Sequence, residues 1–201
     1  MQHLTANAIV CATRAHGETG VIARFLTEHH GIVAGYVAGG RGRVLRPVLI
    51  PGNLVAVEFS SRSDSQLPSA RPELLESRGP WLGEPLPAAG LGWATALTAA
   101  SLPERQPFPA LWTSLGALLT AICHAPSARG WAAALVGYES LLLRELGYGV
   151  PPILPDPDDF VAILDNLDRL GPQIARHALA DHRADVMGAR AVLRERLGKI
   201  A

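Results

Sequence analysis

The stretch that decides the fold runs from Leu4 to Phe59 and contains four short apolar segments. They are LTANAIVCAT (4–13), VIARFLT (21–27), IVAGYVA (32–38) and LVAVEF (54–59), separated by HGETG (16–20), EHHG (28–31), GGRGR (39–43) and PGN (51–53). Segments of this length that are rich in β-branched residues and bounded by glycine or proline predict short strands. Their close succession favours a small barrel or sandwich. Residues 60–72 are polar, and we expect a loop there.

From about residue 80 onward the apolar residues follow a helical period instead. One apolar face is formed by Phe108, Leu111, Trp112, Leu115, Leu118, Leu119 and Ile122, and another runs from Trp131 to Leu146, where Gly147 is a suitable stop. Asp156 is expected to cap a third helix that Gly171-Pro172 ends, and a fourth begins near Arg183. The sequence therefore predicts an α+β multidomain protein, with a β-rich module before an all-α domain.

Composition excludes several classes of protein. The chain has 201 residues, 18 basic and 18 acidic side chains, and 48% hydrophobic residues, which is too apolar and too weakly charged for a disordered chain. The two cysteines, Cys11 and Cys123, are far apart in apolar runs, so we expect small core residues in a reducing compartment rather than a disulfide framework.

No targeting or membrane segment is expected. Met1–Thr13 lacks the basic start and long apolar run of a signal peptide. The two uncharged windows, Pro85–Pro103 and Gln106–Cys123, are interrupted by proline, glycine and hydroxyl residues or are too short after their prolines. The sequence predicts a soluble cytoplasmic protein.

Positive charge is concentrated in the β-rich module. Residues 1–59 carry five arginines against three acids, namely Arg14, Arg24, Arg41, Arg43 and Arg46 against Glu18, Glu28 and Glu58. Three of the arginines lie in a glycine-containing loop, where guanidinium groups can pair with phosphate oxygens while the main chain comes close. From the charge alone, two interpretations of this loop stay open: a contact with a phosphate backbone, and a solvated hairpin tip kept soluble by arginine.

No catalytic or metal-binding pattern is present in the sequence. The histidines lack the short fixed offsets of zinc ligands, and the glycine loop lacks the lysine and hydroxyl residue of a nucleotide-hydrolysing loop. Neither a nucleophile elbow nor an HExxH motif occurs. We therefore assign no catalytic residue, no metal and no cofactor, and we expect a protein that is not an enzyme.

Several short motifs follow one another in a fixed order. They are AIV (8–10), HGE (16–18), FLTE (25–28), HG (30–31), GGRGR (39–43), RPVL (46–49), PGNL (51–54), LPER (102–105), YESLL (138–142) and LGYG (146–149). In this order and spacing, over about residues 4 to 150, they resemble the RecO family of bacterial recombination mediators.

The resemblance implies an N-terminal OB-fold domain over residues 1–78 and a helical domain over 79–201. It implies a DNA repair and homologous recombination mediator in the bacterial nucleoid that responds to DNA damage. Such a protein binds single- and double-stranded DNA, anneals complementary strands and helps load the RecA recombinase with RecR. In this chain we expect the DNA to be positioned by Arg14, Arg24, Arg41, Arg43 and Arg46. The resemblance also implies binding of the acidic C-terminal tail of single-strand-binding protein by the helical domain.

The chain departs from the family pattern in two respects. Many members carry a four-cysteine zinc module after the LGYG motif, whereas this chain has no cysteine after Cys123, so we expect no zinc module. Aromatic residues are sparse and Lys199 is the single lysine, which leaves arginine as the main phosphate ligand. Two other readings remain open: a protein-interaction adaptor whose small barrel does not bind DNA, and a hydrolase with an unmarked site.

Overall fold

The computed structural model describes residues 2–63, 66–180 and 183–200. The chain divides into two compact units. The first comprises Met1–Pro80 together with Leu102–Pro109, and the second comprises Trp81–Ser101 together with Ala110–Ala201. The expected helical domain, residues 79–201, included Leu102–Pro109, which the structure groups with the first unit.

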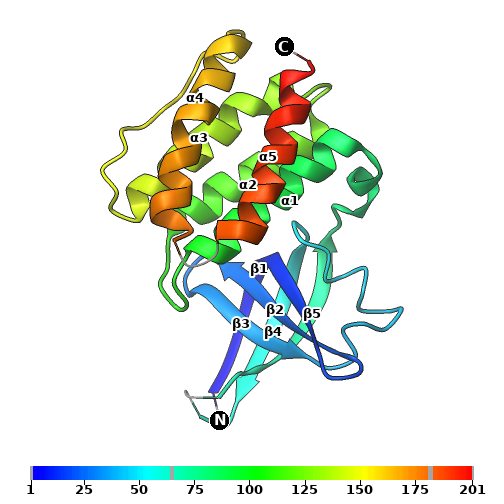
Figure 1. Cartoon of the computed structure of the whole chain (residues 1–201). Helices are drawn as coiled ribbons and strands as arrows, with labels where there is room; N and C mark the ends of the chain where they lie inside the picture. Colours follow the sequence, from blue (N-terminus) through cyan, green and yellow to red (C-terminus); the bar gives the residue numbers. More distant parts are fainter. Residues whose placement is uncertain (1, 64–65, 181–182, 201) are drawn as a thin grey trace. The chain divides into compact units, whose positions relative to one another are not determined.

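The first unit is a closed five-stranded barrel (Figure 1). Its strands are β1 (Gln2–His16), β2 (Gly20–Thr27), β3 (Gly31–Val37), β4 (Leu54–Ser61) and β5 (Ser69–Glu76). They are hydrogen-bonded in the order β1-β2-β3-β5-β4, and β1 also pairs with β4. Every pairing is antiparallel except the short parallel contact of β3 with β5 at Tyr36 and Ser69. This arrangement agrees with the expected OB-fold.

The long strand β1 belongs to both sides of the barrel. Its first half pairs with β4, its second half pairs with β2, and the register shifts between Val10 and Ala12. An irregularity of this kind bends a strand and increases its twist, which allows β1 to turn the corner of the barrel. The barrel core is apolar, and Phe25 and Phe59 meet edge to face in it with ring centroids 5.6 Å apart.

The strand β5 contradicts the sequence prediction of a loop over 60–72. Residues 69–72 form its first half, where Ala70 and Pro72 are buried and alternate with exposed Ser69 and Arg71. The two-residue alternation is present in the sequence, but neither of the two inward residues, alanine and proline, is a good strand former. Pairing with β4 therefore decides the conformation of this segment.

The segment Leu102–Pro109, which we call the strap, is joined to the barrel by main-chain bonds. The amide of Arg105 donates to the carbonyl of Ile32 over 2.8 Å, and Glu104 forms an isolated parallel bridge with Ile32. Gly31 has φ +64°, and a Cβ at this position would overlap the main chain of Gln106. Glycine at position 31 therefore permits the close approach of strap and barrel.

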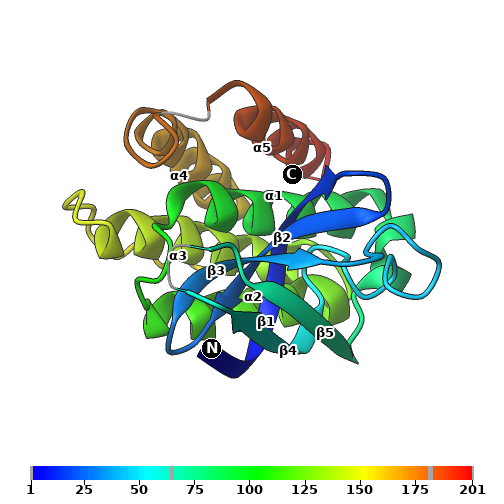
Figure 2. The same ribbon diagram turned by 90° about the horizontal axis from the view of Figure 1, so that it is seen from below.

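The second unit is built from helices. They are the 3₁₀ turn η1 (Gly79–Gly83), α1 (Pro85–Ser101), α2 (Pro109–His124), α3 (Arg129–Glu145), α4 (Phe160–Gln173), the π-helical turn η2 (Ile174–Ala178) and α5 (Arg183–Gly198). Helix α5 packs along α1, and α4 packs along α3 (Figure 1 and Figure 2). Within the described residues no helix has both the length and the apolarity to cross a membrane.

Two predicted helix ends were wrong. The N-cap of α4 is Asp159, whose carboxylate accepts from the amide of Ala162 over 2.9 Å, whereas Asp156 forms a local turn by accepting from the amide of Asp158. At the other end, α4 continues through Gly171-Pro172 to Gln173. Gly171 serves packing instead: a Cβ there would lie 2.6 Å from Nη1 of Arg190.

Three other expectations are confirmed. Gly147 ends α3 with φ +86°, and its amide and that of Tyr148 donate to the carbonyls of Arg144 and Leu143. Cys11 and Cys123 are both buried, and neither forms a disulfide. Burial raises the pKa of the Cys11 thiol to about 12, so this residue stays protonated and acts as a small core side chain.

Candidate nucleic-acid interface

The arginine-bearing loop between β3 and β4 is a series of turns rather than an open strand of chain. The amide of Gly42 donates to the carbonyl of Gly39 over 2.8 Å, and the amide of Arg46 donates to the carbonyl of Gly42 over 2.9 Å. The positive φ of Gly39, +67°, is the backbone conformation that favours glycine. Asn53 closes the loop, because its side-chain amide donates to the carbonyls of Pro47 and Val48. These bonds hold the loop in one shape.

Arg41 links this loop to the turn between β1 and β2. Its main-chain amide donates to the carbonyl of Thr19 over 3.0 Å, and its Nη1 donates to the carbonyl of Glu18 over 3.0 Å. The remaining guanidinium N–H groups of Arg41 are directed at no side chain that the structure describes. The residue is exposed, so these donors face solvent.

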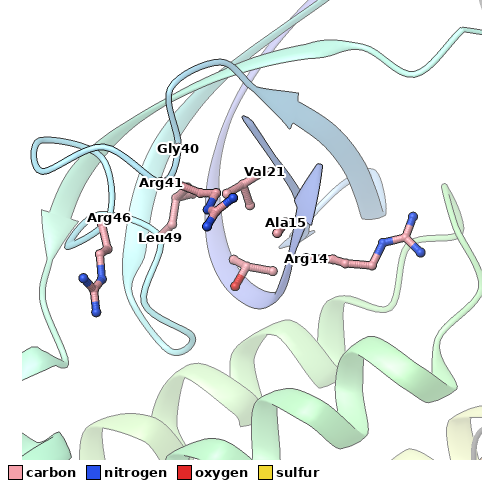
Figure 3. Close-up of a pocket in the computed structure, with 8 residues that line it drawn as sticks. Arg14, Ala15, Val21, Gly40, Arg41, Arg46 and Leu49 are labelled. Carbon is pink, nitrogen blue, oxygen red and sulfur yellow. The ribbon is translucent and has the colours of Figure 1, made fainter. Parts of the chain in front are cut away.

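A pocket of about 360 Å³ lies where this loop meets the ends of β1 and β2. Its lining residues are Thr13, Arg14, Ala15, Val21, Gly40, Arg41, Arg46 and Leu49, and none of them is acidic. Figure 3 shows Arg41 beside Val21 and Leu49, with the side chains of Arg14 and Arg46 extending away from it on opposite sides. The three positive charges therefore lie at the pocket and on either side of it, a row that suits a polyanionic backbone.

Two other loop residues are exposed beside the pocket. Arg43 lies on the same loop and is exposed. Val44 follows it, with 81% of its surface exposed. An exposed aliphatic side chain between arginines offers an apolar contact for a base or a sugar. The structure therefore places four of the five predicted arginines at this end of the barrel: Arg14, Arg41, Arg43 and Arg46.

The strand register also defines an outward face on β1, β2 and β3. Arg14 lies opposite Ile22, which lies opposite Tyr36, and His16 lies opposite Gly20. Directly opposed residues of antiparallel strands point to the same side, so these side chains share one face. The rings of His16 and Tyr36 meet edge to face at 5.8 Å, and a Cβ at Gly20 would overlap the Tyr36 ring.

This aromatic pair was missed in the sequence. The available signal was the two-residue offset between Arg14 and His16, which puts both on one face of a strand. Tyr36 could not be added without the register, because it depends on which residue of β3 lies opposite Ile22. OB-folds bind single-stranded nucleic acids with basic side chains that contact the phosphates and aromatic rings that stack on the bases. Arg14 beside His16 and Tyr36 offers both kinds of side chain on one face.

The structure separates Arg24 from the loop arginines. Its Nη1 lies 3.0 Å from Oε1 of Glu104, and its Nη2 donates to the carbonyl of Leu102 over 3.4 Å. The strap thus neutralises much of the charge of Arg24 and takes two of its donors. DNA contact by Arg24 remains a prediction, and the geometry gives it a second role in fixing the strap.

The strand order of the barrel and its arginine-lined loop place the first unit in the class of OB-fold modules. Comparison with protein families is more specific. Residues 1–78 match the family model described as the recombination protein O N terminal region, and residues 85–151 match that of its C terminal region. The chain belongs to the RecO family.

Individual relatives agree with this assignment. The chain is similar to the DNA repair protein RecO of Phenylobacterium zucineum, with 42% identity over 145 residues, or 72% of this chain and 58% of that protein. The corresponding protein of Rhodospirillum centenum is 43% identical over 147 residues, covering 73% and 57%. The chain therefore matches less than two thirds of the length of these relatives. Helices α4 and α5 lie beyond the residues that the family models match.

Proposed function

We propose that this protein is a DNA-binding recombination mediator that anneals complementary strands and, with RecR, helps RecA replace single-strand-binding protein in the bacterial nucleoid. The observation that carries the proposal is the pocket lined by Arg14, Arg41 and Arg46 without an acidic residue. Neutralising phosphates with arginine lowers the repulsion between two strands. No covalent step is needed, so the proposed role is not enzymatic.

The experiment is a salt series on a fluorescent single-stranded oligonucleotide. The protein is compared with the variant Arg41→Ala/Arg43→Ala/Arg46→Ala. If each arginine contacts about one phosphate, each adds about 0.7 to the slope of log affinity against log salt. The triple variant should therefore have a slope that is flatter by about 2. The loss should be similar for every base sequence, because phosphate contacts do not identify bases.

A matched control separates this effect from a general loss of charge. The variant Arg71→Ala/Arg169→Ala/Arg176→Ala removes three exposed arginines outside the pocket and should keep the wild-type slope. Thermal unfolding checks that both variants fold, since exposed substitutions usually change stability by about 0.5 kcal/mol or less. A triple loop variant that folds, keeps the wild-type slope and anneals at the wild-type rate would contradict the proposal. Binding without salt dependence would favour the adaptor function.

We further propose that the helical unit binds the tail of single-strand-binding protein in a pocket of its own. This pocket, of about 290 Å³, has apolar walls from Leu86, Ile122 and Trp131 and a cation, Arg129. One acidic residue, Glu84, also lines it, so the acidic part of the peptide would have to lie toward Arg129. Such a pocket suits an acidic peptide with a hydrophobic end. Arg129 lies over the Phe160 ring at 4.6 Å, and its Nη2 donates to the carbonyl of Ile200, which fixes its position.

Isothermal titration with the tail peptide tests this second site. The variant Arg129→Gln should weaken peptide binding about tenfold, as expected when a charge-assisted contact worth about 1.5 kcal/mol is lost. Arg169→Gln, an exposed arginine of α4 outside the pocket, should bind as the wild type does. Equal affinities for the wild type, Arg129→Gln and Arg169→Gln would show that the peptide binds elsewhere. The absence of any binding heat would show that the tail of single-strand-binding protein is not a partner.

A further inference from the structure

A second pocket of the barrel, of about 290 Å³, lies away from the arginine loop. Its lining residues are His3, Leu4, His30, Val33, Phe59, Ser61, Pro68 and Arg105. None of them lines the first pocket. His3 and Arg14 stand eleven positions apart on β1, which corresponds to about 36 Å of extended strand before bending. The two pockets therefore lie toward opposite ends of this strand.

The floor of this second pocket is apolar, and its rim carries one arginine and two histidines. Val33 and Phe59 are almost completely buried, with 2% and 3% of their surfaces exposed, and Leu4 lies opposite Phe59 in the β1–β4 pairing. His3, His30 and Arg105 are exposed at the rim, and no acidic residue is among the lining residues. An apolar floor that contains an aromatic ring, beneath an arginine and two imidazole groups that can donate hydrogen bonds, suits a base or sugar attached to a phosphate.

Arg105 lies at the rim of this pocket in a fixed backbone conformation. Among the residues that the structure describes, no carboxylate pairs with its guanidinium, because the neighbouring Glu104 is taken by Arg24. Its backbone has φ +58°, the only positive φ of a described residue other than glycine. A strained conformation of this kind persists only where the surroundings fix it, and such residues cluster at functional sites. Here the bond to Ile32 and the close contact of Gly31 with Gln106 supply that constraint.

We propose that this second pocket binds a nucleotide of a second DNA strand, with the phosphate on Arg105 and the histidines at the rim and the base or sugar against Phe59 and Leu4. The inference rests on the proposed function, since it assumes that the first strand occupies the arginine loop. Annealing requires two strands on one protein, and two separate phosphate sites on one barrel provide them. The spacing of the sites along β1 keeps the strands apart until they pair.

The test combines annealing kinetics with a direct titration of the full chain. In the variant Arg105→Gln the annealing rate of two complementary oligonucleotides should fall at least fivefold, while the affinity for one oligonucleotide stays within twofold. Arg71→Gln, an exposed arginine of β5 outside both pockets, should match the wild type in both measurements. His3→Gln/His30→Gln changes the same pocket without altering the strap, so it serves if Arg105→Gln melts early.

The titration uses a 5′-phosphorylated thymidine dinucleotide and follows backbone amide signals by NMR. Saturable shifts at Ile32 and Val33 that disappear in Arg105→Gln are the expected result. Inorganic phosphate that produces the same shifts at the same concentration would overturn a nucleotide site. Wild-type annealing by a folded Arg105→Gln variant would overturn the second-strand site while leaving the proposed function intact. If the variant Arg41→Ala/Arg43→Ala/Arg46→Ala keeps the wild-type dependence of DNA affinity on salt, the proposed function itself would be contradicted.

Discussion

Asp168 and Arg194 show how a single pair of side chains couples stability to pH. Nε and Nη2 of Arg194 donate to the two carboxylate oxygens of Asp168 over 2.8 and 2.7 Å. These hydrogen bonds from Arg194 hold the pKa of the Asp168 carboxyl below its usual range, and they outweigh the opposing effect of partial burial. A carboxyl whose pKa is lower in the folded protein than in the unfolded chain stabilises the fold above its unfolded pKa. That contribution is lost as the pH falls through the folded pKa.

We therefore predict that Asp168→Asn lowers the free energy of unfolding at pH 7 by about 0.5–1 kcal/mol, the range for an exposed bidentate pair. As the pH falls through the lowered pKa of Asp168, the wild-type carboxylate becomes protonated, so the difference between the two proteins should disappear. Urea unfolding at pH 7 and across an acidic pH series measures both effects. Asp158→Asn, at an exposed aspartate before α4, should change neither. A deficit that persists at the acidic pH would show that the effect is not ionic.

At the scale of the elements, the strands were easier to predict than their ends. The pattern indicated β2, β3 and β4 within one or two residues, because two-residue alternation with β-branched side chains is a local property. It underestimated β1, whose ends at Gln2 and His16 are held by β4 and β2 in turn. It missed β5, because the proline and the exposed arginine in this segment are not typical of a strand. The main-chain hydrogen bonds to β4 hold the segment in the extended conformation.

The helix ends of the second unit follow the same logic. Asp156-Pro157 has the sequence of a helix start, but the cap is Asp159, and Phe160 then becomes the first buried residue of α4. The sequence has three aspartates within four positions, Asp156, Asp158 and Asp159, and each of them is a suitable N-cap residue. Contact of Phe160 with the guanidinium of Arg129 is a tertiary feature that favours the later start. Likewise Gly171 reads as a stop, yet its role is to make room for Arg190.

At the scale of the whole molecule, a buried ion pair holds the second unit together. Glu139 of α3 is fully buried and accepts from Nε1 of Trp93 over 2.7 Å. Nε and Nη2 of Arg190, on α5, donate to its two oxygens over 3.0 and 2.7 Å, and Nη2 also donates to the carbonyl of Leu167 on α4. One network thus joins α1, α3, α4 and α5, including the two helices beyond the family match.

We predict that Arg190→Met destabilises the protein by about 3–5 kcal/mol, because it leaves the Glu139 carboxylate buried without its cation. The double variant Glu139→Leu/Arg190→Met should recover part of this loss, since no buried charge remains. Denaturant unfolding measures the free energies.

Hydrogen exchange of the same variant tests the proposed organisation into two domains. The amides of α3, α4 and α5 should exchange faster, whereas the barrel strands and the strap amide of Arg105 should stay protected. Uniform acceleration that includes the barrel would show that the two units open as one.

Apart from β5, the sequence by itself determined the kinds of element, their order and the family, because strand alternation, helical period and turn motifs are local. It also identified the loop arginines, since Arg41, Arg43 and Arg46 lie within six positions. Only the tertiary structure decided how distant residues combine. In the folded protein Arg14 lines the same pocket as the loop arginines, and Arg24 forms an ion pair with Glu104. Arg105 lines a second pocket together with His3 and His30. Strand register and the return of the strap create these neighbours, and neither is encoded in any short stretch of the chain.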